Sequence, residues 1–274
     1  MASARVSDNE ISFARPPVVE VIAGVAIDGL GAESAPLLTA FWHTALRDRF
    51  PKIEQQPPYF PPMEEFPVGA AGVGFQFNVG APVARLWAST DDGQELIQLQ
   101  PGWFACNWRK VKPQDEYDRW LSRRAAFERS FRALTSFLAA EGMGEPKITQ
   151  CEVTYVNHIG AGALEHGHAD FESLFSVALP PALPFKLEQV ASQASFVLEE
   201  NGQPTGRLHA RVFPAFDRDG KTPLYVLELT VRGRPRGDGL SGALTFLDGG
   251  RAAINKAFVA LTTAEMQARW GRVQ

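Results

Sequence analysis

The sequence lacks the long apolar runs that carry a chain into or across a membrane. None of its 274 residues belongs to an apolar run of roughly 18 residues, the length that a spanning helix needs. Residues 1–14 are polar and lack the apolar core of a secretory signal. We therefore expect a cytoplasmic protein with no membrane partner.

Cysteine is scarce as well. The two cysteines, Cys106 and Cys151, each lie inside an apolar strand pattern, which predicts buried free thiols in a reducing compartment. Their wide spacing does not resemble a Cys–Cys metal motif. A chain of this size buries roughly three quarters of its unfolded surface, so it folds without disulfide or metal. We predict no cofactor and no metal.

Marks of several function classes are also missing. The sequence contains no nucleophile elbow of the form Gly-x-Ser-x-Gly and no phosphate-binding P-loop. Its net charge of −4 disfavours wholesale binding to nucleic acid, which leaves a basic footprint on most domains that bind it. Apolar residues make up 45% and charged residues 21%, the profile of an ordinary globular protein.

What the first half does contain is an ordered series of strand and helix patterns. Residues 18–27 are rich in β-branched residues and alternate, which predicts a strand. A helix is expected after Ser34 and ends before Pro51. Strand patterns follow at residues 72–79, 82–89 and 95–109. A long helix then begins at Pro113, with acidic residues in its first turn, and ends at Gly142.

The second half repeats this order. Its strand patterns occupy residues 148–159, 185–199, 207–216 and 223–231. A short helix is expected at residues 170–177, after the first of these strands. A final long helix is expected from about Leu247, and Thr262 with Glu265 forms a capping box for a last turn.

This repetition predicts an internal duplication of a β-α-β-β-β-α unit. Residues 1–14 form a flexible tail, residues 15–144 the first repeat and residues 145–274 the second, together one compact pseudo-dimeric unit. The expected class is α+β, with antiparallel sheet and helices packed on one face. The element order is like that of helix-grip and TATA-binding-protein-like folds. The two opening strands are the most apolar, which favours one joined sheet with these strands at its centre.

A proline-rich segment separates the first helix from the next strands. Six prolines fall between residues 51 and 69, interspersed with Tyr59, Phe60, Met63 and Phe66. Proline fixes φ and removes a donor, so this segment is expected to be an extended loop and not a regular element. It either covers the protein's own core or binds a partner as a polyproline II segment.

Two glutamates and an Asn-His pair are the first candidates for a binding site. Glu20 and Glu152 hold matching places in the two opening strands, where burying an unpaired carboxylate is costly. Near a pseudo-twofold axis they would share a proton or bind a cation; otherwise they face solvent or pair with arginine. Asn157 and His158 close the second of these strands.

Arginines and a histidine pair supply the remaining candidates. Arg124 interrupts the apolar seam of the long helix, which aims it either out of the core or into the junction of the halves. A loop with three arginines is a candidate anion site, or else a plain surface loop; they are Arg232, Arg234 and Arg236. His166 and His168, with a nearby acid, would suit zinc, but loop histidines without metal are the ordinary case.

Five motifs in order resemble a sporadically distributed prokaryotic family of about this length. They are Pro-Pro-Val-Val-Glu-Val-Ile from residue 16, Leu-Ile-Gln-Leu-Gln from 96, Asn-Trp-Arg-Lys from 107, Glu-Val-Thr-Tyr-Val-Asn-His-Ile from 152 and Leu-Thr-Thr-x-Glu-Met from 261. The resemblance covers nearly the whole chain. That family has no assigned activity, so the resemblance implies no catalytic residues.

Three classes of function follow from these patterns. The first is a non-enzymatic binding protein that holds a small molecule or a protein partner between its halves. The second is an enzyme that uses Glu20, Glu152 and His158 as acid–base groups. The third, which the net charge disfavours, is a nucleic-acid binder with an arginine-lined surface.

Overall fold

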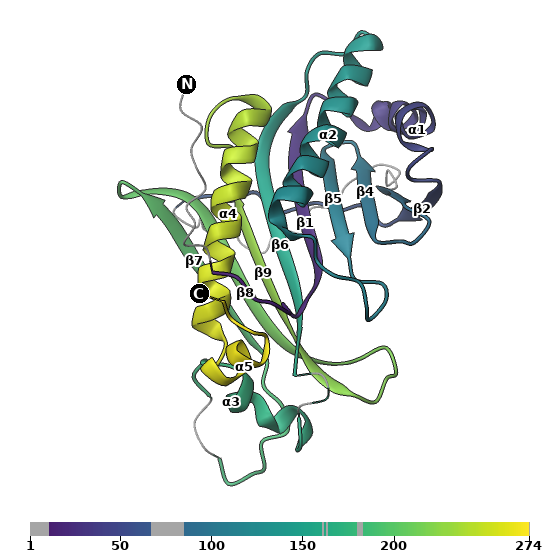
Figure 1. Cartoon of the computed structure of the whole chain (residues 1–274). Helices are drawn as coiled ribbons and strands as arrows, with labels where there is room; N and C mark the ends of the chain where they lie inside the picture. The colour runs from purple at the N-terminus through teal and green to yellow at the C-terminus, as the bar shows by residue number, and fades with distance from the viewer. Residues whose placement is uncertain (1–10, 67–84, 161, 163, 180–182, 274) are drawn as a thin grey trace.

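A single antiparallel sheet of nine strands runs through the computed structural model, which describes residues 11–66, 85–160, 162, 164–179 and 183–273. Its strand order is β2-β3-β4-β5-β1-β6-β9-β8-β7 (Figure 1). Five α-helices accompany it in these described ranges, which confirms the α+β class, and none of them is long and apolar enough to cross a membrane.

The strands and helices have the following bounds. The strands are β1 (Val18–Asp28), β2 (Lys52–Gln56), β3 (Arg85–Ser89), β4 (Glu95–Gln100), β5 (Trp103–Arg109), β6 (Lys147–Ile159), β7 (Ser192–Glu200), β8 (Gln203–Phe216) and β9 (Pro223–Gly233). The helices are α1 (Ala35–Phe41), α2 (Arg119–Ala140), α3 (Phe171–Leu174), α4 (Gly239–Leu261) and α5 (Ala264–Arg269). A π-helical turn (Trp42–Leu46) extends α1, and 3-10 turns cover Ala32–Ser34 and Gly167–Asp170.

β1 and β6 pair with each other at the centre of the sheet. The first half continues outward from β1 through β5, and the second half continues from β6 through β9. Both strands bury their apolar side chains, among them Val25, Cys151 and Val153, which are fully buried. The predicted joining of the halves into one sheet, with their most apolar strands in the middle, is confirmed.

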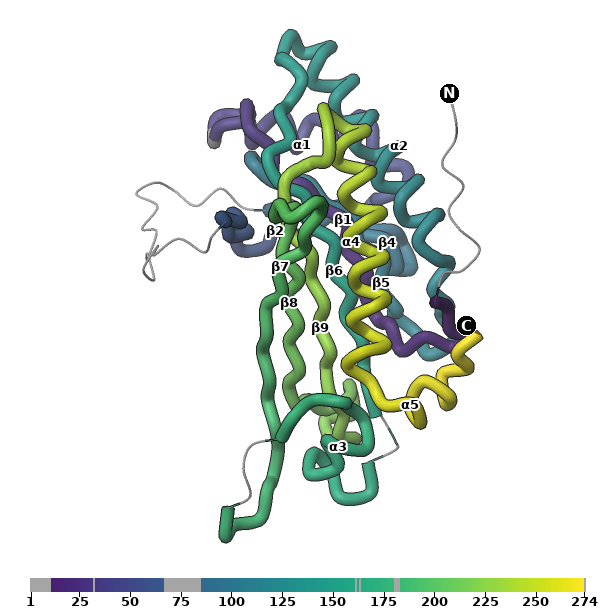
Figure 2. Tube along the Cα trace, turned by 90° about the vertical axis from the view of Figure 1, so that its left-hand side faces the viewer, coloured from purple at the N-terminus to yellow at the C-terminus, as the bar shows by residue number. Residues whose placement is uncertain are grey.

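α2 and α4 lie side by side against one face of the sheet (Figures 1 and 2). The predicted seam of α2 is buried there, namely Trp120, Phe127, Phe131, Leu134 and Leu138. Asp248 of α4 accepts hydrogen bonds from the Trp120 indole (2.7 Å) and from Arg124 (2.9 Å). The long helix of the first half, α2, therefore contacts the long helix of the second half, α4, directly.

α4 begins earlier than its sequence pattern predicts. It starts at Gly239 and not near Leu247, and it already buries Ala243 and Leu244. The four glycines of α4, at positions 239, 242, 249 and 250, conceal the helix because glycine is a poor helix former. One of them has a packing role: a Cβ on Gly250 would lie 2.7 Å from Val153 Cγ1, so glycine lets α4 approach the sheet closely.

Two helix boundaries were also predicted wrongly. Asp115, expected in the first turn of α2, instead accepts hydrogen bonds from the main-chain N–H groups of Val111 (3.0 Å) and Lys112 (2.7 Å), and α2 begins only at Arg119. The cap of α5 is Thr263 and not Thr262, since the Thr263 side chain accepts from the Met266 N–H.

The strands of the first half differ from their prediction in two ways. The pattern at residues 95–109 is two strands, β4 and β5, because the chain reverses at Pro101 and Gly102, where Gly102 has a φ of +83°. The proline-rich segment is not wholly irregular, since β2 occupies its start and pairs with β3. The predicted strand at residues 72–79 lies outside the described residues, as do residues 82–84.

The last residues of the predicted N-terminal tail are anchored to the C-terminal helices. Phe13 is buried and forms a β-bridge with Arg272. Its ring packs edge-to-face on Phe258 of α4 (5.3 Å between centroids) and on Trp270 (6.2 Å). The described start of the chain thus closes one end of the core.

Candidate functional site

The face of the sheet opposite α2 and α4 carries polar side chains across the junction of the halves. Alternation along β6 turns Glu152 to this face while Cys151 and Val153 enter the core. The register then aligns Glu152 with Arg232 of β9, and Arg232 with Arg207 of β8. We call this surface the polar face; it comprises Glu20, Gln98, Gln100, Asn107, Gln150, Glu152, Thr154, Arg207, His209, Thr230 and Arg232.

Residues 57–66, which follow β2, cross the polar face, and we call this segment the strap (Figure 2). Two buried glutamines hold its main chain. Gln100 accepts from the Tyr59 N–H (2.8 Å) and donates to the Tyr59 carbonyl (2.9 Å). Gln150 accepts from the Glu64 N–H (2.8 Å) and donates to the Pro62 carbonyl (3.0 Å). Each half contributes one of these two clamps.

A tyrosine of the strap reaches a buried ion pair at the junction of the halves. Arg232 donates from Nε to Glu152 Oε2 at 2.5 Å, and the Glu152 side chain is only 5% exposed. The Tyr59 hydroxyl donates to the same carboxylate oxygen at 3.0 Å. Burial and the nearby Glu152 carboxylate raise the pKa of Tyr59 well above its usual range, so the phenol stays a donor.

A second carboxylate of the strap lies in a pocket on β8. Glu64, whose side chain is 4% exposed, forms an ion pair with Arg207 and contacts His209 Nε2 at 2.6 Å. Burial alone would raise the pKa of Glu64. The hydrogen bond from His209 and the charges of His209, Arg207 and Arg232 outweigh burial and hold that pKa below its usual value. Glu64 therefore stays ionised in this pocket.

A relay of side chains crosses the first-half part of the polar face. Arg85 donates to Gln98 (2.8 Å), Gln98 donates to Asn107 (2.8 Å), and Asn107 donates to Glu20 (2.7 Å). Trp103 packs on the Tyr59 ring at 5.0 Å. Among the described residues the buried indole N–H of Trp103 finds no acceptor.

Glu20 and Glu152 share the polar face but do not meet. The register places Glu20 opposite Val156 and Glu152 opposite Gly24, so four residues, or about 13 Å of strand, separate them. Burial raises the pKa of Glu20, and the Asn107 hydrogen bond and the Arg109 charge only partly offset this rise. A proton or cation shared between these two carboxylates does not fit this register.

The Asn-His pair at the end of β6 divides between the two faces. Asn157 is buried on the side of α2 and α4 and donates to the Leu227 carbonyl (3.1 Å). His158 faces the other way, six residues along β6 from Glu152. Burial lowers the pKa of His158, and the Asp217 carboxylate opposes this only in part, so the ring is neutral at pH 7. Neither side chain joins the network around Glu152.

The arginine candidates take separate partners. Arg124 pairs with Asp248 and, at 3.3 Å, with Glu128, so it lies in the helix layer and not on the polar face. Arg232 pairs with Glu152, whereas Arg236 pairs with Glu200 (3.4 Å). The anion site that the sequence predicts for this loop therefore stays a prediction.

Arg234 lines a groove of about 620 Å³ beside the start of α4. The sequence there, Gly237-Asp-Gly-Leu-Ser-Gly242, matches the Gly-x-Gly-x-x-Gly pattern of dinucleotide-binding loops and follows a strand. The pattern has a packing cause, since Gly237 has a φ of +109° and a Cβ on Gly242 would overlap the Gly237 carbonyl. α4 leads to α5 and not to a parallel strand, so the βαβ context of such loops is missing in the described chain.

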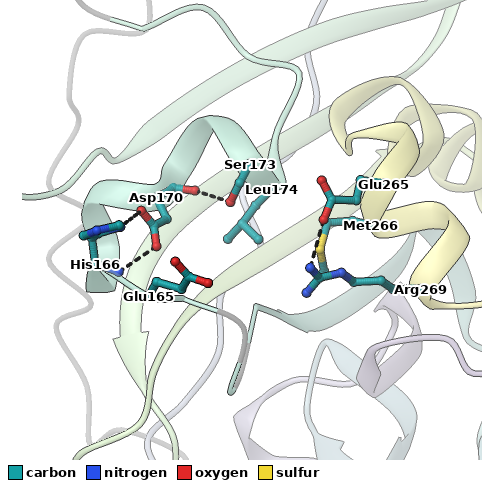
Figure 3. Close-up of a pocket in the computed structure, with 8 residues that line it drawn as sticks. All are labelled: Glu165, His166, Asp170, Ser173, Leu174, Glu265, Met266 and Arg269. Atoms are coloured by element: carbon teal, nitrogen blue, oxygen red, sulfur yellow. Dashed lines mark hydrogen bonds and ion pairs between the residues drawn. The ribbon is translucent and has the colours of Figure 1, made fainter.

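A second groove, of about 230 Å³, lies between α3 and α5 (Figure 3). His166 pairs there with Asp170 at 3.1 Å, and the Ser173 hydroxyl donates to the Asp170 carbonyl at 2.7 Å, so serine and histidine do not form a nucleophile–base pair. His168 instead contacts the main-chain carbonyl of Ala215 at 2.8 Å. No cluster of three metal-binding side chains occurs among the residues that the structure describes.

The thiols offer no nucleophile either. Both cysteines are free, as predicted, with Cys151 buried and Cys106 half-buried. Burial raises the pKa of Cys106 to about 12 and also raises that of Cys151. Neither thiol is ionised at neutral pH, which leaves the polar face as the best-built site.

Comparison with known proteins found no family model that matches the chain and no curated protein that matches its sequence. The resemblance to a sporadically distributed prokaryotic family therefore stays a prediction.

The sequence did not reveal most of the polar face. Among its residues, Glu20, Glu152 and Arg232 were candidates, and Tyr59 was expected only as part of an extended loop, whereas Glu64 and the glutamines that hold the strap were missed. One signal was available. Gln100 and Gln150 each alternate with apolar residues in a strand, and an amide that such a strand buries needs hydrogen-bond partners.

Proposed function

We propose that this chain is a non-enzymatic, cytoplasmic polypeptide-binding protein that holds an extended segment of a partner on its polar face. The carrying observation is the pair of glutamine clamps. Gln100 and Gln150 each make two hydrogen bonds to the main chain of a crossing segment. Recognition through the main chain is how proteins grip extended peptides regardless of their sequence, and side-chain pockets then add specificity.

Charge and burial support this function over the other two classes. Glu152 lies four residues from Glu20 and six from His158 along the paired strands, so the three proposed acid–base groups do not converge on one bond. The arginines of the polar face are matched by carboxylates, as Arg232 is by Glu152. A matched surface does not provide the excess positive charge on which nucleic-acid binding depends.

We further propose that the sheet arose by internal duplication, with one long helix of each repeat packed on the face opposite the polar face. Ile22 and Thr154 lie directly opposite each other, and a twofold axis between them relates β1 to β6. The same axis relates Glu20 to Glu152. It also relates their neighbours, because Glu20 pairs in register with Arg109 as Glu152 does with Arg232. Two Glu–Arg pairs in corresponding places support two repeats.

The polypeptide-binding function is tested with a labelled peptide. A fluorescein-labelled decapeptide with the sequence of residues 57–66 is titrated into the full chain carrying Tyr59→Ala, which weakens the strap's own attachment. We expect saturable binding, followed by anisotropy. In the same receptor, Gln100→Ala or Gln150→Ala removes two hydrogen bonds and weakens binding by about thirtyfold, since each bond contributes about 1 kcal/mol.

The exposed Gln193→Ala variant of the edge strand β7 is the matched control and leaves binding unchanged. A receptor that keeps its circular dichroism spectrum but binds no peptide would contradict the proposal. So would binding that ignores both clamp substitutions.

A further inference from the structure

The carboxylate pocket on β8 makes more specific contacts to the strap than are needed merely to cover the sheet. Arg207 and His209 project from alternate positions of β8 and converge on Glu64. Arg207 also donates to the Glu65 carbonyl (3.0 Å) and stacks on the Phe66 ring (4.6 Å). A second contact orients the His209 ring, because its Nδ1, on the side away from Glu64, contacts Ser195 Oγ at 3.0 Å.

This pocket selects an ionised carboxylate. A buried ion pair adds little stability compared with well-packed apolar side chains. A segment that only covered the sheet would therefore not need an ion pair at this position. What such a pair does supply is specificity, since only an acid satisfies the guanidinium and the imidazole together. Glutamate is the acid that the strap delivers, while the adjacent Glu65 is exposed.

A second subsite lies at a fixed spacing from the first. The Tyr59 hydroxyl meets Glu152 and Arg232 on β6 and β9, and the register places Arg232 beside Arg207. A peptide that crosses the strands therefore presents its aromatic residue to one subsite and, five residues later, its glutamate to the other. Gln150 grips the main chain between them through Pro62 and Glu64.

We propose that Arg207 and His209 form a glutamate-recognition subsite, and that the strap is the chain's own occupant of it. The partner is a proline-rich segment with an aromatic residue five positions before a glutamate, and it binds by displacing the strap. This inference rests on the proposed polypeptide-binding function and specifies the chemistry of the partner. Because the strap is tethered, it competes at an effective concentration of roughly millimolar, so the partner binds best when the strap is weakened.

The test uses the full chain with Glu64→Gln, which replaces the strap's own carboxylate by a neutral amide and keeps both Arg207 and His209. Three labelled decapeptides are compared by anisotropy: the sequence of residues 57–66, the same with glutamine for Glu64, and the same with glutamine for Glu65. We expect the first to bind this receptor at least tenfold more tightly than it binds the wild-type chain. The Glu64-substituted peptide should bind at least tenfold more weakly, and the Glu65-substituted peptide should match the first. Arg207→Gln in the receptor should abolish this preference.

Each outcome has a distinct meaning. Equal binding of all three peptides overturns the glutamate subsite while the polypeptide-binding function stands. No binding of any peptide, to this receptor or to the Tyr59→Ala chain, overturns both. Equal affinity of the wild-type and Glu64→Gln chains shows binding elsewhere and also overturns the subsite. Should Glu64→Gln fail to fold, the Tyr59→Ala chain serves as the receptor, because its pocket is intact.

Discussion

Glu20 and Glu152 hold corresponding positions in two strands, yet their surroundings give them opposite effects on stability. Glu152 is buried against the guanidinium of Arg232, with Tyr59 as a further donor. Glu20 has Asn107 as its hydrogen-bond partner and keeps a raised pKa because burial outweighs its neighbours. The sequence marks both as polar positions in apolar strands. It does not encode the partners, since these are 80 and 87 residues away and depend on register.

Replacing each glutamate by glutamine should change stability in opposite directions. Glu152→Gln leaves Arg232 buried without its counter-charge and should lower the free energy of unfolding by about 3 kcal/mol. Glu20→Gln keeps an oxygen for Asn107 and removes a charge whose burial is unfavourable, so it should raise that free energy at pH 7. Urea unfolding measures both. The exposed pair of Glu265 and Arg269 supplies the control, and Glu265→Gln should cost less than about 0.5 kcal/mol. Equal losses for Glu20→Gln and Glu152→Gln would contradict the distinction.

The lowered pKa of Glu64 predicts a pH dependence of stability with a definite sign. A carboxyl group whose pKa is lower in the folded chain stabilises it fully above its unfolded value, here 4.5, and loses that contribution as the pH falls through the folded pKa. The stability difference between wild type and Glu64→Gln should therefore be present at pH 7 and shrink below about pH 4.5. Urea midpoints at several pH values measure it. A difference that is the same at pH 3 and pH 7 would show that the Glu64 charge does not hold the strap.

At the scale of elements, the alternation of polar and apolar residues predicted the central strands well, but local composition did not reveal β2 or the start of α4. β6 was predicted to within one residue at its start, because polar and apolar residues alternate along its buried course. β2 was missed since it lies at the sheet edge between prolines, where few apolar residues mark a strand. The start of α4 was missed because its glycines lower helix propensity. The packing role of these glycines depends on a neighbouring strand that the local sequence does not reveal.

Two adjacent glycines of α4 give a matched test of that packing role. A Cβ on Gly250 would lie 2.7 Å from Val153 and 3.2 Å from Val231, both in the core, whereas a Cβ on Gly249 would meet only the flexible end of Arg236 at 3.4 Å. Gly249→Ala should stabilise the chain by up to about 1 kcal/mol through helix propensity. Gly250→Ala gains the same propensity but overpacks the core, so it should destabilise by about 1–3 kcal/mol. Thermal unfolding of both variants decides. Stabilisation by both would show that α4 does not press on the sheet at Gly250.

At the scale of the whole molecule, the two halves of the chain depend on each other more than their separate sequence patterns imply. The apolar opening strands predicted that the halves share a sheet, and β1 and β6 do pair along most of their length. The strap adds contacts that no sequence pattern announced, since Glu64 of the first half is held by Arg207 of the second. Arg124 and Asp248 join the halves again in the helix layer. Local patterns predict the elements of each half, but not the side chains that join the two halves across a sheet.

This dependence predicts that neither half folds alone. Expressed separately as residues 1–143 and 144–274, each half exposes the apolar edge of β1 or β6 and loses half of the core under α2 and α4, which favours aggregation. Each should lack a cooperative thermal transition by circular dichroism. Co-expressed, the halves should form a one-to-one complex by size-exclusion chromatography, because the β1–β6 pairing and the strap contacts need no peptide bond between Met143 and Gly144. The complex should lose stability if its first half carries Glu64→Gln and should tolerate the exposed Glu265→Gln in its second half. A monomeric, cooperatively melting half would show that the repeats are independent domains.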